Sequence, residues 1–143
     1  MSITEVVRNY IYISDYHIAN NSEILNWIGI THIINCAKEI PDYHNDKFTY
    51  LNLGLLDTDD DILKCKSDVV TFIDSIKNGK LLVHCAAGIS RSPAIVIMYL
   101  MTKLNLCYSH AHSYIKEKRS FINPNHNYVK QLTNSQTNCS QCK

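Results

Sequence analysis

The sequence predicts one α/β domain with a central, mostly parallel sheet flanked by helices. Two observations predict this class. Two segments of strand character, Phe48–Leu55 and Leu81–Cys85, are separated by Lys66–Lys77, a segment with helical apolar periodicity, and the compact β-branched run Thr31–Cys36 before them predicts a further buried strand. A long apolar segment with the character of a buried helix, Ser92–Met101, follows directly. Strands that alternate with helices are joined by right-handed crossovers, which produce a largely parallel sheet.

Composition indicates a small domain with enough residues to bury a core. The chain has 143 residues and a formal net charge of +1, which argues against a nucleic-acid or membrane surface. No apolar run reaches the ~20 residues of a membrane span, and we expect no secretory leader. The six cysteines are scattered, which favours free thiols in a reducing compartment. We therefore expect a cytoplasmic protein, with access to the nucleus and oligomeric state left open.

The N-terminal third predicts a strand and a short helix before Thr31–Cys36. Residues 9–14 (NYIYIS) alternate with the period of a strand, so we expect the chain to open there. The polar run Asn20–Ser22 can cap a helix over Glu23–Trp27, which Gly29 can end. We expect Trp27 to lie in the core.

The middle of the chain predicts a strand, an acidic loop and a helix. Phe48–Leu55 has strand character, and the acidic run 57–61 follows it directly. Lys66–Lys77 then forms an amphipathic helix. Ligands of parallel sheets bind outside the carboxyl ends of the strands. The acidic loop and the loop after Cys85 should therefore share one rim of the sheet.

Two more helices complete the expected domain, residues 1–132. Ser109–Lys118 forms one, with Ala111, Tyr114 and Ile115 inward, and the other starts at Asn123-Pro124. Residues 133–143 are polar without periodicity, and we expect a disordered tail.

Metal sites are not expected in this chain. We expect His110 and His112 at the surface, because we find no partner at metal spacing, and the lone Cys139-x2-Cys142 pair is weak evidence for zinc.

The stretch Leu81–Ser92 (LLVHCAAGISRS) carries the chemistry. An apolar strand delivers His84 and Cys85, five loop residues follow, and Arg91 stands at the start of a helix. Successive N–H groups of such a loop can converge on one anion, aided by the positive end of the helix. The guanidinium of Arg91 matches two oxygens of a phosphate. The same field favours the thiolate of Cys85, which can attack phosphorus and form a phosphocysteine.

Other readings of this stretch explain less. A buried structural cysteine needs neither an arginine six residues on nor a glycine-containing loop. A metal site needs a second ligand at close spacing. A nucleotide-binding P-loop needs Gly-Lys-Ser/Thr, which is absent.

The motif His84-Cys85-x5-Arg91-Ser92 resembles the signature of the cysteine-dependent protein phosphatases, and AAGISRSP resembles their dual-specificity branch. The similarity runs from about Ile3 to Leu132. The resemblance implies that fold, action on phosphotyrosine and phosphoserine/threonine, no metal and no cofactor. It implies that the loop binds the substrate phosphate through Ala86, Ala87, Gly88, Ile89, Ser90 and Arg91.

The resemblance also implies roles for the remaining site residues. The family takes a proton for the leaving oxygen from an aspartate on the loop before the signature, and Asp57 matches best, with Asp59 as the alternative. Ser92 matches the hydroxyl that stabilises the departing thiolate. His84 matches the histidine that holds the loop and tunes the thiol.

The expected function is therefore hydrolysis of protein phosphomonoesters, with a phosphoprotein as the partner and neither nucleic acid nor membrane. Two alternatives remain: a phosphoprotein-binding pseudophosphatase, and a phosphatase of lipid or RNA phosphates. The neutral loop AAGIS disfavours a multiply charged substrate.

Cys36 provides a redox hypothesis. If Thr31–Cys36 and Leu81–Cys85 are parallel neighbours, ~4.8 Å apart, Cys36 could trap oxidised Cys85 as a disulfide. The alternative is that Cys36 is a small core residue.

Overall fold

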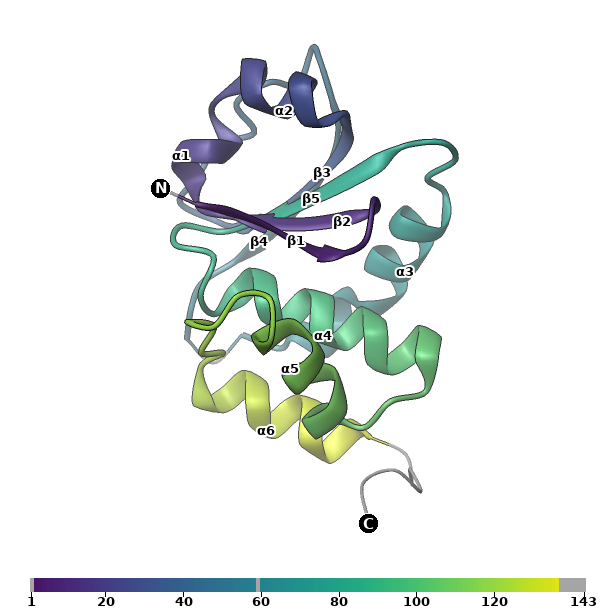
Figure 1. Cartoon of the computed structure of the whole chain (residues 1–143). Coiled ribbons are helices and arrows are strands. Elements are labelled where there is room, and N and C mark those ends of the chain that lie inside the picture. Colours follow the sequence, from purple (N-terminus) through teal and green to yellow (C-terminus); the bar gives the residue numbers. More distant parts are fainter. Residues whose placement is uncertain (1, 59, 137–143) are drawn as a thin grey trace.

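The computed structural model describes residues 2–58 and 60–136 and contains one mixed sheet between two layers of helices (Figure 1). The sheet has the strand order β1-β2-β5-β3-β4. Its strands are β1 (Ile3–Val7), β2 (Ile11–Ser14), β3 (Ile30–Ala37), β4 (Thr49–Leu55) and β5 (Lys80–His84). Only β1 is antiparallel to its neighbour, β2, within this sheet. The predicted α/β class is confirmed.

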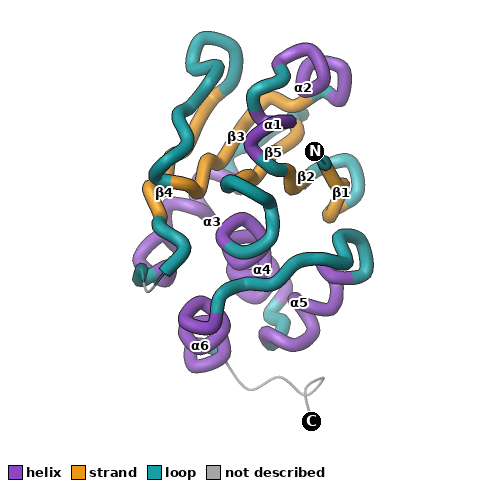
Figure 2. Tube along the Cα trace, turned by 90° about the vertical axis from the view of Figure 1, so that its left-hand side faces the viewer, coloured by secondary structure: helices purple, strands orange, loops and turns teal. Residues whose placement is uncertain are grey.

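Helices cover both faces of the sheet. The first layer holds α1 (Tyr16–Ala19) and α2 (Ser22–Ile28). The second holds the 3-10 helix η1 (Ile62–Cys65) and four helices, α3 (Lys66–Asp74), α4 (Arg91–Leu104), α5 (Tyr108–Lys116) and α6 (His126–Ser135) (Figure 2). Among the described residues, no helix has the length and apolar character needed to cross a membrane.

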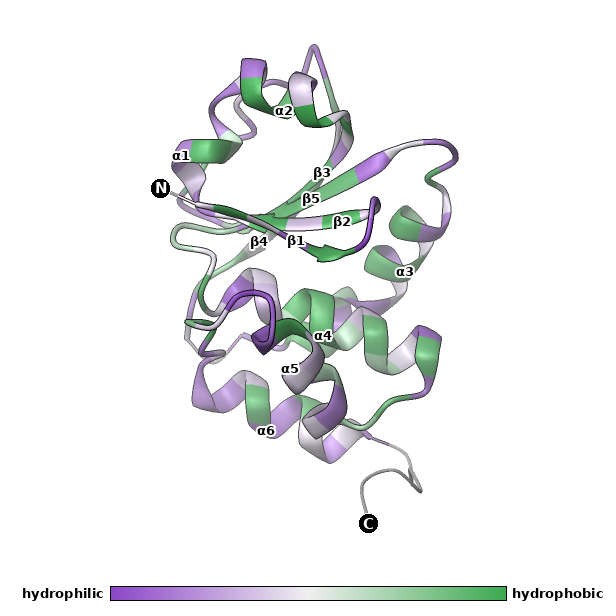
Figure 3. Ribbon diagram, viewed as in Figure 1, coloured by the Kyte–Doolittle hydropathy of each residue, from purple (hydrophilic) through white to green (hydrophobic). Residues whose placement is uncertain are grey.

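Strand β5 and helix α4 form the centre of the core. Side chains of a strand alternate between faces, so Leu81 and Val83 pack against the larger helical layer and Leu82 against the smaller one. The first ten residues of α4 are all buried, and the helix is apolar on nearly every side (Figure 3). This packing holds both ends of the loop between β5 and α4.

Some predicted elements need correction. The chain does not open at residue 9, because β1 precedes it; Asn9 lies in the turn between β1 and β2 with a φ of 55°. Trp27 is not a core residue, since it is 89% exposed. The helix α2 is only seven residues long and buries Leu25, and two residues along a helix turn a side chain by about 200°, to the opposite side.

The C-terminal helices also differ in detail from the prediction. Tyr114 was expected inward, but it lies at the surface with the Lys118 ammonium 4.2 Å from its ring centroid. Helix α6 extends to Ser135, into the segment expected to be disordered. Cys139 and Cys142 lie outside the described residues.

Candidate active site

Residues 85–90 form the loop between β5 and α4. Hydrogen bonds to the carbonyl groups on its outer side hold this loop in place. Five consecutive carbonyls accept hydrogen bonds from the surrounding protein. The acceptors and donors are Ala86 O from Tyr16 N, Ala87 O and Gly88 O from Arg119, Ile89 O from Asn123 N, and Ser90 O from Ala94 N. In a planar trans peptide the N–H points away from the C=O. The N–H groups of residues 87–91 therefore face the concave side of the loop.

Gly88 allows the loop to close tightly. Its φ is +70°, a left-handed conformation that side chains rarely adopt. A Cβ there would lie 2.5 Å from Nη2 of Arg119 and 2.8 Å from the carbonyl oxygen of Ser14. Any larger residue would have to displace both the buried arginine and the backbone.

The sulfur of Cys85 lies at the bottom of this loop. It is 2% exposed, accepts a hydrogen bond from the Gly88 N–H at 3.3 Å, and lies 3.2 Å from Oγ of Ser92. Ser90, not Ser92, is the N-cap residue of α4, so the Ser92 hydroxyl is directed to the sulfur rather than to a helix cap.

His84 is buried beneath the loop. Its Nδ1 is 3.2 Å from the carbonyl oxygen of Cys85. Burial lowers the pKa of His84 to about 4. The ring is therefore uncharged at neutral pH, which suits a residue that holds backbone in place.

Arg91 is fixed by a carboxylate that the sequence did not single out. Its Nη1 and Nη2 donate to the two oxygens of Glu39 at 2.7 and 2.6 Å, and Nη1 also donates to Leu55 O at 2.9 Å. Three of its five N–H donors are thus engaged within the described residues. The Nε–H and the second Nη2 hydrogen remain, side by side, for a bound anion. The Arg91 hydrogen bonds lower the pKa of Glu39 to about 2, so this carboxylate stays ionised.

Asp57 lines the same pocket as Cys85. Its Oδ1 accepts hydrogen bonds from Ser90 Oγ at 2.7 Å and from Asn125 Nδ2 at 2.8 Å. A pocket of about 420 Å³ includes Asp57, Cys85 and Arg91 in its lining. Asp59, the alternative acid, lies outside the described residues.

Residues at and before α6 hold both loops. The Asn123 N–H binds the carbonyl of Ile89, and the Asn125 N–H donates to Ser90 Oγ at 2.9 Å. From α6 itself, Tyr128 donates its hydroxyl to Leu56 O, and Gln131 donates to Asp60 O at 2.8 Å. The acidic loop and the cysteine loop are thus positioned by one support.

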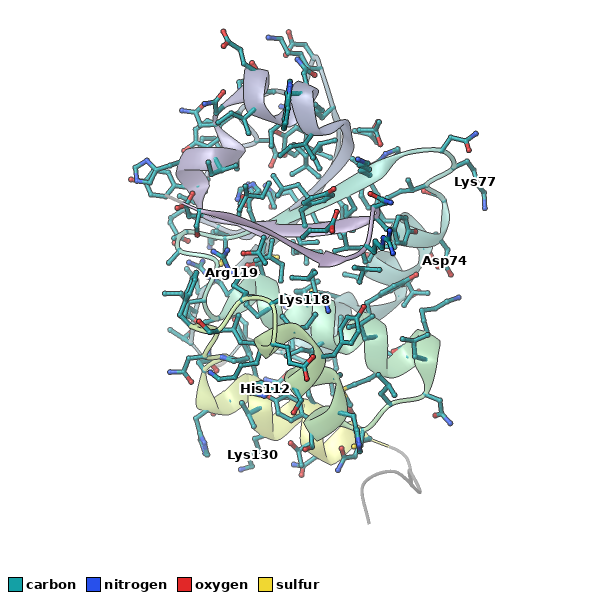
Figure 4. All side chains as sticks on the ribbon, in the orientation of Figure 1. Asp74, Lys77, His112, Lys118, Arg119 and Lys130 are labelled. Carbon is teal, nitrogen blue, oxygen red and sulfur yellow. The ribbon has the colours of Figure 1, made fainter. Side chains whose placement is uncertain are left out.

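A second arginine that the sequence did not indicate, Arg119, binds the carbonyl groups on the outer side of the loop. Arg119 is 1% exposed and donates from Nε to Gly88 O at 2.8 Å and from Nη1 to Thr4 Oγ1 at 2.8 Å. It lies between α5 and the sheet (Figure 4). Glu39 could have been suspected from its place just after β3, at the carboxyl edge of the sheet. We find no comparable sequence signal for Arg119.

Similar proteins identify the family. Residues 11–138 match the family model described as dual specificity phosphatase, catalytic domain. A probable rhodanese domain-containing dual specificity protein phosphatase of Dictyostelium discoideum is 37% identical over 93% of this chain and 29% of its own length. Human dual specificity protein phosphatase 1 is 34% identical over 86% of this chain and 34% of its own length. This chain thus spans about a third of the length of these curated relatives.

A solved structure supports the same family assignment. The crystal structure of human tyrosine phosphatase-like serine/threonine/tyrosine-interacting protein has a TM-score of 0.84 and 35% identity, covering 92% of this chain and 93% of that one. With the family match over most of the described residues, the comparisons lead to one conclusion. The chain belongs to the dual specificity phosphatase catalytic domain family.

Proposed function

We propose that this domain hydrolyses phosphotyrosine and phosphoserine/threonine in proteins through a phosphocysteine on Cys85. One observation carries the proposal. The five outward-bonded carbonyls direct a row of N–H groups toward the sulfur, beside the two available donors of Arg91. This arrangement binds a phosphate and places its phosphorus next to a nucleophile.

In the first step the sulfur of Cys85 attacks phosphorus, forming an S–P bond while the P–O bond to the substrate breaks. The loop N–H groups and Arg91 hold the equatorial oxygens. The leaving oxygen takes a proton from the carboxyl group of Asp57, whose Oδ1 is fixed by Ser90 and Asn125. This leaves Oδ2 as the oxygen that carries the proton.

In the second step water attacks the phosphorus and the S–P bond breaks. Asp57, now a carboxylate, accepts a proton from the water, as microscopic reversibility requires. The Ser92 hydroxyl, 3.2 Å from Sγ, donates to the thiolate as it departs. His84 keeps the Cys85 carbonyl, and with it the loop, in position. No cofactor takes part in this scheme.

The side chains of the loop favour a phosphomonoester of a protein as the substrate. The loop side chains are neutral, which suits one phosphate group better than the clustered charges of inositol lipids or RNA ends. We place this activity in the cytoplasm, where thiols stay reduced. A binding-only role, as in a pseudophosphatase, is the alternative, but nucleophile, arginine and candidate acid around one pocket support turnover.

The test uses an aryl phosphate and a panel of phosphopeptides, phosphoinositides and capped RNA. Cys85→Ser should abolish turnover yet still bind phosphopeptide, because the alcohol is not ionised and the loop N–H groups remain. Arg91→Ala should lose binding and turnover together. Cys65→Ser, at a buried cysteine in η1, is the matched control. Turnover that survives in Cys85→Ser would rule out the covalent mechanism.

A further inference from the structure

Exposed apolar side chains gather around the pocket that contains Cys85. Among the described residues, seven large apolar side chains are exposed to solvent, and four of them belong to segments that border this pocket. These four are Tyr16, Leu56, Ile89 and Phe121. Single exposed apolar residues are common on protein surfaces, whereas a group of them around a cavity indicates a binding surface.

Three of the four side chains lie in or directly beside the lining of the pocket. Ile89 is part of the lining itself, and Leu56 directly precedes Asp57, another residue of the lining. The Tyr16 N–H donates to the carbonyl oxygen of Ala86 at 2.9 Å, which places the start of α1 against the same loop. Three separate segments of the chain therefore each bring one apolar side chain to the pocket.

Phe121 comes from the segment between α5 and α6, which passes beside the loop of residues 85–90 (Figure 2). Its ring contacts Arg119, whose Cζ lies 4.5 Å from the ring centroid, and Arg119 in turn binds the carbonyl of Gly88. Asn123, two residues further along the chain, lines the pocket. Phe121 is 48% exposed, so packing within the domain uses only part of its apolar surface.

A phosphorylated residue can enter the pocket only together with its neighbours in the substrate chain. In an extended peptide successive side chains point to opposite sides, so the residues two before and two after it face the same way as the phosphorylated side chain. They lie ~7 Å from it along the peptide, which places them at the edge of the pocket.

We propose that Tyr16, Leu56, Ile89 and Phe121 form a surface, here called the apolar rim, that binds large apolar side chains at these two positions of the substrate. This proposal rests on the proposed function, because it takes the occupant of the pocket to be a phosphorylated residue of a protein.

Charge around the pocket favours the same kind of substrate. Glu39 binds Arg91, a residue of the lining, and the Glu39 side chain is 48% exposed. The Arg91 hydrogen bonds lower the pKa of Glu39 to about 2, so this carboxylate is negative at neutral pH. Asp57, in the same lining, is a second acidic side chain. Acidic residues next to the phosphorylated residue should therefore be repelled, whereas apolar residues should not.

The test measures the affinity of the full chain with Cys85→Ser for phosphotyrosine peptides, so the result does not depend on turnover. Three peptides differ only at the positions two before and two after the phosphotyrosine, which carry leucine, alanine or glutamate. The leucine peptide should bind about 10-fold more tightly than the alanine peptide, because the leucine side chains cover apolar surface of the rim. The glutamate peptide should bind more weakly than the alanine peptide. Leucines moved to the positions directly before and after the phosphotyrosine should lose most of the gain.

Matched variants assign the preference to the apolar rim. Phe121→Ser and Leu56→Ser should each lower the ratio of leucine-peptide to alanine-peptide affinity by about 2–5-fold. Tyr114→Ser and Leu104→Ser remove an exposed aromatic and an exposed leucine that lie outside the pocket lining, and they should leave the ratio unchanged. Because the ratio compares two peptides, a loss of phosphate affinity or of stability that affects both peptides equally cancels.

The outcomes separate this proposal from the proposed function. Phosphopeptide binding without a preference for leucine would overturn the apolar rim and leave the proposed function standing. The same holds for a preference that survives in both Phe121→Ser and Leu56→Ser, or that is equally large for the shifted leucines. Failure to bind any of the phosphopeptides would overturn both. Turnover of the same peptides by the unsubstituted chain tests the proposed function alone.

Discussion

Substitution of Glu39 is the most direct test of how Arg91, the arginine proposed to bind phosphate, is positioned. Glu39→Gln removes the negative charge and places an amide NH₂ against an N–H donor of Arg91, so one of the two short hydrogen bonds is lost. The Leu55 carbonyl still holds Nη1. Arg91 should then spend part of its time away from the geometry that presents its remaining donors to phosphate.

The size of the expected effect follows from how deeply the ion pair between Arg91 and Glu39 is buried. Removing one partner of a fully buried ion pair costs about 3–5 kcal/mol, whereas exposed pairs contribute about 0–1 kcal/mol. The Arg91 side chain is 7% exposed and that of Glu39 48%, so an intermediate value of about 1–2 kcal/mol is expected. This corresponds to a fall in kcat/KM of about 5–30-fold. Affinity for inorganic phosphate should fall in parallel, because in the proposed mechanism Arg91 binds both ground and transition state.

Steady-state kinetics with an aryl phosphate measure this effect. Glu23→Gln, which neutralises an exposed carboxylate in the first turn of α2, is the control and should be unchanged. In an Arg91→Lys background the Glu39→Gln effect should shrink, because lysine cannot form the two parallel bonds. Unchanged or increased kcat/KM in Glu39→Gln would refute the positioning role, as would an equal loss in both backgrounds.

Three further predictions concern the acid, the buried histidine and the redox chemistry. Asp57→Asn should slow phosphopeptides more than aryl phosphates with good leaving groups and remove the basic limb of the pH–rate profile, because a protonated carboxyl is required; if Asp59→Asn alone does this, the assignment is wrong. Burial lowers the pKa of His84 to about 4 from 6.5, so between these values the unfolded chain binds a proton that the folded chain does not. The free energy of unfolding should therefore fall by ~1.4 kcal/mol per unit as pH decreases from about 6.5 to 4, and urea titrations of His84→Gln should show a shallower dependence. Mild peroxide should inactivate the enzyme reversibly, and Cys36→Ser should make recovery with a dithiol largely fail, whereas equal recovery would exclude a disulfide to Cys85.

The structure supplies part of the basis for the redox prediction. Strands β3 and β5 are parallel neighbours, and Asn35 is paired with His84, so Cys36 and Cys85 follow at the same edge. Both sulfurs are free and buried. Burial, with the nearby Cys85, raises the pKa of the Cys36 thiol well above its usual value. Cys36 should therefore not be the residue that peroxide attacks first.

Much of the fold could be predicted because apolar periodicity reports directly on burial. Strand β3 was recognised from a compact β-branched run, helix α4 from a long apolar segment, and α2 from its caps. Strand β1 was missed because it is an edge strand that carries Glu5 and has only one fully buried residue. Trp27 was misplaced because hydrophobicity alone does not say which side of a two-turn helix faces the sheet.

The candidate site, like the fold, could be predicted from the sequence only in part. Cys85, Arg91 and the loop between them are contiguous, so one motif contains them, and Asp57 could be placed by the shared rim of the sheet. Their chemical roles stay predictions. Glu39 and Arg119 could not be assigned from spacing, because each acts through partners from distant segments of the chain. Glu39 binds a guanidinium, and Arg119 binds two loop carbonyls and the hydroxyls of Ser2 and Thr4.

The position of Trp27 has a practical consequence for optical measurements. It is the only tryptophan in the chain, and at 89% exposed its indole is solvated in the folded as well as the unfolded state. Its intrinsic fluorescence should therefore change little on denaturation and report mainly on events at the surface of α2. Tyr128, fully buried beside the acidic loop, and Tyr99 in the middle of α4 change environment completely on unfolding. Tyrosine near-ultraviolet dichroism should accordingly follow the folding transition that tryptophan emission leaves nearly invisible.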